Sequence, residues 1–187
     1  MWLFWSCLTT NRHLIKEQSP GSGGLIGIPV LQAFETFSWG ADKTLEIAPR
    51  TSTKSVPHAE LCFDGNHPLV QVGYDGRSLV FALDTGASNT DLYPPFASAF
   101  PDLIRSAIKT DSYKMEGVGG AKYLEAATLE SLRFSIGEFP VILKSAGVLL
   151  KPTTDSSKFF AGNLGIDLLQ QAHKTTFDFK AMTLTLQ

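Results

Sequence analysis

The aspartate at position 84 is the residue whose surroundings most clearly predict chemistry. It ends an apolar run in the stretch FALDTGAS and is followed at once by Thr85 and Gly86. Two carboxylates held about 3 Å apart cannot both be ionised, so one can take a proton from water while the other polarises a carbonyl group. Gly86 suits such a pair, because a residue without a Cβ lets two backbones approach closely. Asp84 is therefore a candidate for one member of a pair of carboxylates that share a proton.

Two glycine-rich stretches follow the aspartate along the chain. Gly117-Val118-Gly119-Gly120 predicts a hairpin tip, and no Gly-Lys-Ser/Thr follows it to indicate a phosphate loop. Asn163-Leu164-Gly165 predicts a tight turn that leads into a short helix and serves as scaffold behind the site. Each stretch also has a plain interpretation as an ordinary turn, and so does Asp-Thr-Gly at the end of a strand.

Strands must position most of these residues. HPLVQVGYDGRSLVFAL (67–83) contains two apolar runs joined by an Asp-Gly pair, which predicts a β-hairpin that ends at the aspartate. Residues 95–108 have a helical pattern broken or restarted by Pro101, and 175–186 alternate as strands do. Residues 121–134 fit either a helix or a strand, and we favour strands. The chain as a whole is expected to be mainly β.

An internal repeat connects the two ends of the chain. GLIGIPVLQ (24–32) matches GNLGIDLLQ (162–170) at an offset of 138 residues, and TLEI (44–47) matches TLTL (183–186) at 139. Such a correspondence favours duplication of one structural unit. It divides the chain into a C-terminal remnant of a first unit (1–50), a linker (51–59) and a complete unit (60–187). One aspartate motif is present where two are expected.

The motifs together resemble those of a known family. The order of Asp84-Thr85-Gly86-Ala87-Ser88, Gly117-Val118-Gly119-Gly120 and Asn163-Leu164-Gly165 is similar to that of retropepsin-like aspartic proteases, in particular bacterial proteins with two such units in tandem. The resemblance covers roughly residues 60–187. It implies a closed β-barrel of the acid protease fold with a short C-terminal helix, and an aspartic-type endopeptidase that needs no cofactor or metal.

The resemblance also implies roles for individual residues. Thr85 would bond across to the equivalent loop of a partner, and Ser88 is placed to donate a hydrogen bond to a carboxylate oxygen. Residues 115–122 would form a flap that closes over an extended peptide. The second aspartate would come from a homodimer or from another retropepsin-like unit. The alternative is a catalytically inactive relic, or a peptide-binding module of the same fold.

Composition excludes several other classes of protein. The formal net charge of −2 and the pI near 6.1 do not favour nucleic acid or an anionic membrane surface as partners. No apolar run approaches the roughly 18 residues of a membrane-spanning helix. His58, Cys62 and His67 match no zinc-binding spacing, and the two cysteines cannot form a disulfide framework. The first ten residues lack the basic region and cleavage site of a signal peptide, so the compartment is left open, although the resemblance leans towards export.

Overall fold

A computed structural model describes residues 2–5, 24–42, 44–47, 57–65, 67–117 and 120–187. The first elements are β1 (Trp2–Trp5), β2 (Gly24–Gly27), α1 (Ile28–Ala33), β3 (Thr36–Gly40) and β4 (Leu45–Ile47). They are followed by β5 (Ala59–Asp64), β6 (His67–Tyr74), β7 (Arg77–Leu83), β8 (Asp91–Leu92), α2 (Pro94–Ala99) and α3 (Pro101–Arg105). The rest are β9 (Ile108–Gly117), β10 (Gly120–Ile136), β11 (Phe139–Leu149), the 3₁₀ turn η1 (Ser156–Lys158), β12 (Gly162–Leu164), α4 (Ile166–Leu169), β13 (Lys174–Asp178) and β14 (Thr183–Leu186). Most of the expected linker, together with Val118 and Gly119, lies outside the described residues.

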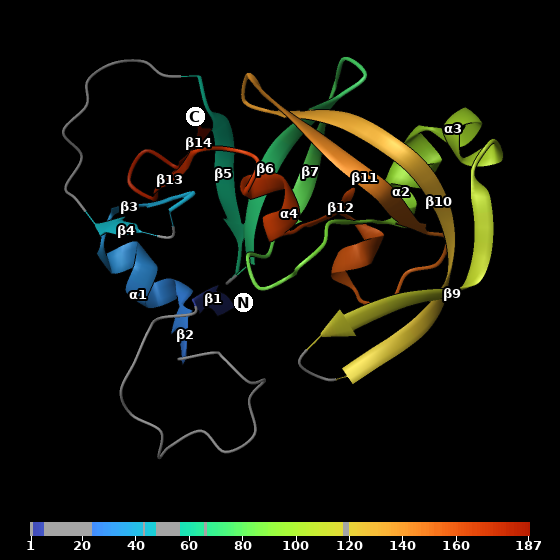
Figure 1. Ribbon diagram of the computed structural model, residues 1–187, viewed down its shortest axis with the longest axis horizontal. Helices are drawn as coiled ribbons and strands as arrows, with labels where there is room; N and C mark the ends of the chain where they lie inside the picture. The colour runs from blue at the N-terminus through green and yellow to red at the C-terminus, as the bar shows by residue number, and fades with distance from the viewer. Residues whose placement is uncertain (1, 6–23, 43, 48–56, 66, 118–119) are drawn as a thin grey trace.

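The fold is mainly β, as the sequence predicts. The described strands form one large sheet in the order β4-β3-β13-β14-β5-β6-β7-β12-β8-β11-β10-β9, and β1 pairs with β2 in a separate small sheet. An additional pairing between β6 and β10 closes the strands β6, β7, β12, β8, β11 and β10 into a ring. Figure 1 shows the long strands β10 and β11 curving around this ring. The short helix expected after Gly165 is present as α4.

The hairpin that precedes the aspartate has the predicted turn. β6 and β7 pair up to Tyr74 and Arg77, and the two residues between them have positive φ angles, 49° at Asp75 and 72° at Gly76. Positive φ at both central positions is what a two-residue hairpin of this hand requires, and Asp-Gly supplies it at low cost. Residues 121–134 lie within β10, so the strand interpretation of that segment is confirmed.

The core fills the interior of the ring. Phe81 and Leu83 of β7 and Leu164 of β12 are at most 1% exposed, so the strand that leads to the aspartate is firmly packed. Burial of such side chains contributes roughly 1.5–3 kcal/mol each, as an upper estimate. Aromatic rings of α2 and β10 meet there, with Phe96 and Phe134 6.1 Å apart. The position of the aspartate is therefore set by a rigid support.

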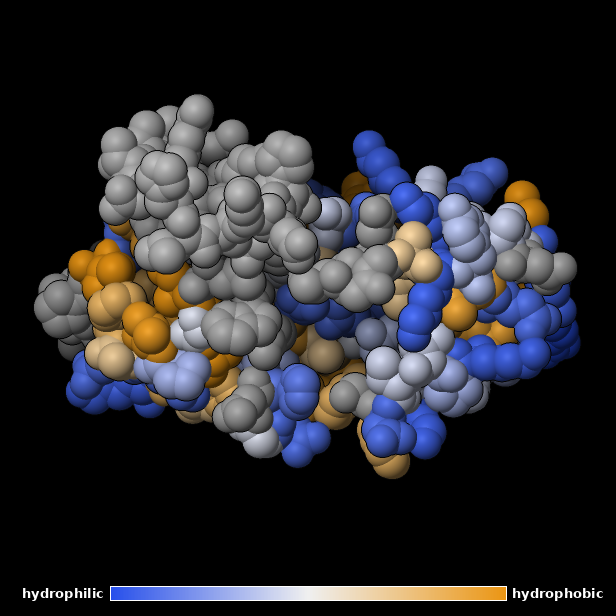
Figure 2. All heavy atoms as spheres, turned by 90° about the horizontal axis from the view of Figure 1, so that it is seen from below, coloured by the Kyte–Doolittle hydropathy of each residue, from blue (hydrophilic) through white to orange (hydrophobic). Residues whose placement is uncertain are grey.

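The N-terminal elements pack onto the C-terminal hairpin. β3 pairs antiparallel with β13, and β4 continues the sheet at its outer edge. Figure 1 places α1 and β2 next to β3 and β4, at the opposite end of the molecule from α2 and α3. At the same end, Figure 2 shows hydrophobic side chains on the surface; Val30 of α1 and Ile47 of β4 are 50% and 49% exposed. Within the described residues, no helix has the length and apolar character needed to cross a membrane.

Candidate active site

Asp84 begins the turn that follows β7. Its backbone N–H donates to the Leu164 carbonyl oxygen at 2.9 Å, which extends the pairing of β7 with β12 by one residue. Its side-chain Oδ1 accepts a hydrogen bond from the Gly86 N–H at 3.0 Å, and its carbonyl oxygen accepts one from the Ala87 N–H at 3.1 Å. The half-buried carboxylate is thus oriented by its own loop before any partner arrives.

Thr85, the residue that follows the aspartate, has a buried hydroxyl. The residue is 5% exposed, and its Oγ1 finds no hydrogen-bond partner among the described residues. A buried polar atom left unsatisfied costs about 1–3 kcal/mol, so such atoms are uncommon in native proteins. The orphaned hydroxyl lies one residue after the candidate catalytic aspartate. A group from outside the described residues that bonded to it would remove this cost.

The turn at Gly165 presses against the back of the aspartate loop. A Cβ on Gly165 would lie 2.6 Å from the Asn89 carbonyl oxygen and 2.9 Å from that of Ala87. The Ile166 N–H donates to the same Ala87 oxygen at 2.9 Å. Since φ of Gly165 is −91°, its conformation alone does not require glycine, and the close approach of the loop does. Asn163-Leu164-Gly165 therefore lies behind the loop, where the sequence analysis expected a scaffold.

A side-chain clamp fastens the loop to α4. Thr90 donates through Oγ1 to the Asp167 carboxylate at 2.7 Å and through its N–H at 3.0 Å, and Oγ1 accepts from the Gly165 N–H at 2.9 Å. Thr90 is 2% exposed. Sequence reasoning missed both side chains of the clamp. The nearest signal was position in the sequence, since Thr90 lies a few residues after the aspartate and Asp167 a few residues after the start of the glycine turn.

Tyr113 of β9 reaches over the sheet to Asp91 of β8. Its hydroxyl donates to Asp91 Oδ1 at 2.6 Å, and its ring lies where a Cβ on Gly147 would be. Burial raises the pKa of Asp91 and the nearby Asp167 charge adds to this, while the bond from Tyr113 opposes it. The pKa of Tyr113 is also raised, first by burial and then by its bond to Asp91. The contact ties the arm of the β9–β10 hairpin to the base of the candidate site.

Tyr93 shares this acidic environment. Burial, followed by the negative charges of Asp91 and Asp84, raises its pKa to about 12. Tyr93 therefore stays a neutral phenol throughout the acidic and neutral pH range.

Replacement of Asp91 by asparagine is expected to flatten the pH dependence of stability. Because the folded pKa of Asp91 is raised, the folded state holds its proton more tightly than the unfolded chain does. The resulting stability is present below the ordinary value of about 3.9 and is lost as the pH rises through the folded pKa. The asparagine side chain cannot ionise, and its amide oxygen can still accept from Tyr113. Urea unfolding should show that the unfolding free energy of the variant rises relative to that of the unmodified chain between about pH 3 and pH 7.

The matched control for this measurement is Asp75→Asn, at an exposed turn position that tolerates asparagine. A difference between Asp91→Asn and the unmodified chain that stays constant with pH would contradict the assignment.

The expected flap is a hairpin. β9 and β10 pair antiparallel up to Gly117 and Gly120, and Val118 and Gly119 lie outside the described residues. Ser88 lies exposed in the aspartate loop, and the described residues include no hydrogen bond from it to Asp84, so its role stays a prediction. Among the described residues, no group of three or more His, Cys, Asp or Glu side chains is placed to hold a metal ion.

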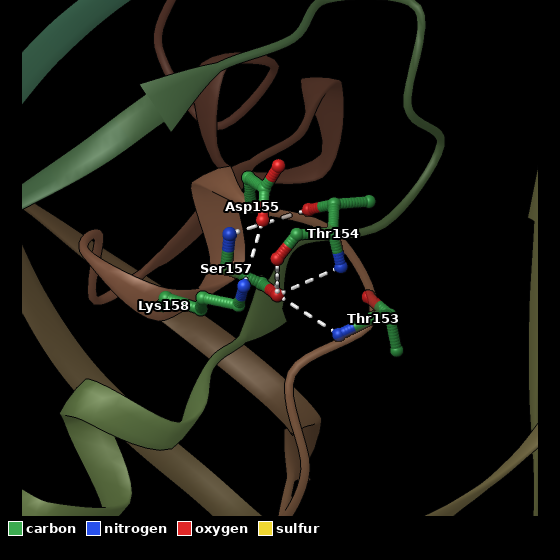
Figure 3. Close-up of polar contacts among 5 residues, drawn as sticks. All are labelled: Thr153, Thr154, Asp155, Ser157 and Lys158. Atoms are coloured by element: carbon green, nitrogen blue, oxygen red, sulfur yellow. Dashed lines mark hydrogen bonds and ion pairs between the residues drawn. The ribbon is translucent and has the colours of Figure 1, made fainter.

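The segment that leads into β12 is built around one buried serine. Figure 3 shows the Ser157 hydroxyl oxygen accepting from the N–H groups of Thr153 and Thr154, at 2.9 and 3.0 Å. The same hydroxyl donates to the Thr154 carbonyl oxygen at 2.7 Å, and Lys158 pairs with Asp155 at 2.7 Å. Ser157 is fully buried and its hydrogen bonds lie within the turn. It therefore acts as scaffold for the approach to the site.

Comparison with known proteins gives a likeness in structure but none in sequence. No protein-family model matches the chain, and no curated protein matches it in sequence. Among solved structures, the chain is similar to a retropepsin-like aspartic protease from Rickettsia conorii, with a TM-score of 0.48 and 19% sequence identity. The match covers 67% of this chain and 86% of that one.

Proposed function

We propose that the chain is an aspartic-type endopeptidase unit. It hydrolyses peptide bonds with a water molecule activated between two aspartates, of which Asp84 is one and the second comes from a partner unit. The observation that carries the proposal is the aspartate loop itself: a carboxylate oriented at the end of a buried strand, followed by a threonine whose buried hydroxyl has no partner among the described residues. Both features fit a loop that meets a second loop of the same kind.

The proposed mechanism assigns a task to each part of the loop. One carboxylate of the pair takes a proton from the attacking water, while the other, protonated, donates a hydrogen bond to the scissile carbonyl oxygen. The bond from the Gly86 N–H keeps Asp84 in place, and Thr85 holds the partner loop. The β9–β10 hairpin, with Gly117 and Gly120 at its end, covers an extended peptide that binds by strand addition.

A peptide-binding module without catalysis is the second candidate. It is favoured by the presence of one Asp-Thr-Gly motif in the sequence, because a single carboxylate cannot form the pair that the mechanism requires. The two functions differ in their dependence on Asp84. A binding module binds peptide equally well after Asp84→Asn, whereas the endopeptidase loses hydrolysis.

Hydrolysis of an unfolded protein between pH 2 and pH 8 tests the proposal, at chain concentrations high enough for units to associate. We expect a bell-shaped dependence of the rate on the acid side of neutrality, since one carboxylate must be ionised and the other protonated. Mass spectrometry of the products should show internal cleavage. Peptide binding without cleavage over this whole pH range would favour the module instead.

A further inference from the structure

Strands β3 and β13 pair about a local two-fold axis. Their antiparallel register places Ser38 opposite Thr176 at the centre of the pairing. The repeat offset of 138 residues carries Ser38 onto Thr176, so the central residue faces its own counterpart. The same offset carries the residue pair on one side of this centre onto the pair on its other side. This is the isologous geometry of two equivalent subunits related by a two-fold axis.

Two hydrogen bonds beyond the strand ends are related by the same two-fold axis. The Ala41 N–H donates to the His173 carbonyl oxygen at 2.8 Å, and the Phe179 N–H donates to that of Glu35 at 2.7 Å. The offset of 138 carries Ala41 onto Phe179 and Glu35 onto His173, so the two-fold axis relates one hydrogen bond to the other. Strands β3 and β4 therefore occupy the place of a second unit against the C-terminal hairpin.

This place is filled by a well-packed core. Phe37 and Phe177 are 1% and 2% exposed, and their rings stack 4.8 Å apart with planes inclined by 2°. Lys174 of β13 also pairs with Glu46 of β4 across the intervening strand. β13 has β3 on one edge and β14 on the other. A second copy of this chain can pair with β13 only by displacing β3.

The pairing of β1 with β2 repeats that of β8 with β12. β12 runs antiparallel to β8 with Gly162 opposite Leu92, and β2 runs antiparallel to β1 with Gly24 opposite Trp5. Since Gly24 and Gly162 are counterparts in the repeat, β1 takes the position of β8. The other edge of β12 holds β7, the parallel strand that leads to Asp84. Among the described residues β1 alone pairs with β2, so no described strand lies at the edge of β2 that corresponds to the β7 edge of β12.

Residue types near that edge agree with the correspondence. Gly27 is the counterpart of Gly165, and its φ of −76° does not by itself demand glycine. At Gly165 the glycine is needed because the aspartate loop lies against it. The counterparts of the clamp residues Thr90 and Asp167 are Leu3 and Pro29, so both polar residues of the clamp have apolar counterparts in the first unit.

We propose that this edge of β2, which corresponds to the β7 edge of β12, is the seat of the second catalytic loop. Its occupant is a strand that runs parallel to β2, ends in an aspartate-bearing turn and continues into β1, as β7 continues through Asp84 into β8. The local two-fold axis then brings this turn to face Asp84. The inference rests on the proposed endopeptidase function and names the partner of that site. A second copy supplying its own Asp84 is the competing source.

A graft supplies the proposed occupant to the full chain. Residues 77–88, RSLVFALDTGAS, are joined directly to Trp2 in place of Met1, because Trp2 is the counterpart of Asn89 in the register of β1 and β2. At nanomolar concentration, we expect the grafted chain to hydrolyse an unfolded protein at least about 100-fold faster than the ungrafted chain. The rate per chain should not change on dilution. A graft copied from the Asp84→Asn sequence is the matched control and should give no increase.

A disulfide tests the seat without relying on activity. In the complete unit Ala82 lies opposite Asn163, whose counterpart is Leu25. With Cys7 and Cys62 replaced by serine, a cysteine at the graft position copied from Ala82 should cross-link to Leu25→Cys on mild oxidation. A cysteine at the position copied from Ser78 should not cross-link. Non-reducing electrophoresis and tryptic mapping report the bond, and circular dichroism verifies that each variant is folded.

The outcomes separate the two proposals. A cross-link at the expected pair without hydrolysis upholds the seat and overturns the endopeptidase. A folded grafted chain without that cross-link overturns the seat. If the ungrafted chain is then active with a rate per chain that rises with concentration, the endopeptidase stands and a second copy is its partner.

Discussion

Asp84→Asn is expected to lower peptide hydrolysis by about 100- to 10,000-fold while the fold is retained. The asparagine side chain has nearly the same shape and its oxygen can still accept from the Gly86 N–H, but it cannot exchange a proton with water. The rate should be measured on an unfolded protein at the acidic optimum. Unmodified and variant chains are compared at the same high concentration and again in the grafted form.

The control for this variant is Asp75→Asn, which removes one carboxylate from the hairpin turn at the other end of β7. Its hydrolysis rate should equal that of the unmodified chain. Cleavage that persists in Asp84→Asn with unchanged product sites would exclude the proposed chemistry, because no other group in the loop can replace the carboxylate.

Phe37→Ala is expected to lower the free energy of unfolding by about 3–5 kcal/mol. Phe37 stacks on Phe177 and also contacts Trp39 and Phe179, with ring centroids 6.0 and 5.7 Å away. Its removal leaves a cavity between β3 and β13, where the two halves of the local two-fold interface meet. Urea unfolding followed by tryptophan fluorescence and circular dichroism measures the loss.

Ile47→Ala is the control on the same hairpin, since Ile47 is 49% exposed and should cost less than about 1 kcal/mol. If Phe37→Ala cost no more than this control, β3 would not be held against β13 as described. The interface would then be free for a second copy of the chain.

Local signals in the sequence were sufficient for several elements. The Asp-Gly pair at 75–76 predicted the hairpin because its positive φ angles are a property of those two residues. The glycine at 165 predicted the turn into α4, but its φ of −91° is ordinary, and the residue is needed because the aspartate loop approaches it closely. Residues 121–134 were ambiguous because Leu124, Ala127 and Leu132 also fit a helix face. Pairing with β9 on one side and β11 on the other decides the question, and both partner strands lie outside the segment itself.

The contacts that shape the candidate site are mostly between distant residues. Thr90 and Asp167 are 77 positions apart, and Asp91 and Tyr113 are 22 apart, so no short motif joins them. Their pairing follows from strand order and register, which bring β8, β9 and α4 together. The repeat predicted that the two ends of the chain are related, while the two-fold pairing of β3 with β13 required the register.

The most direct test of the central claim is a crystal structure, at the pH of maximal hydrolysis, of the grafted chain and of the unmodified chain at high concentration. We expect a second aspartate carboxylate about 3 Å from that of Asp84, with the Thr85 hydroxyl bonded to the facing loop. An Asp84 side chain directed into bulk solvent in both crystals, with no second acid within reach, would contradict it.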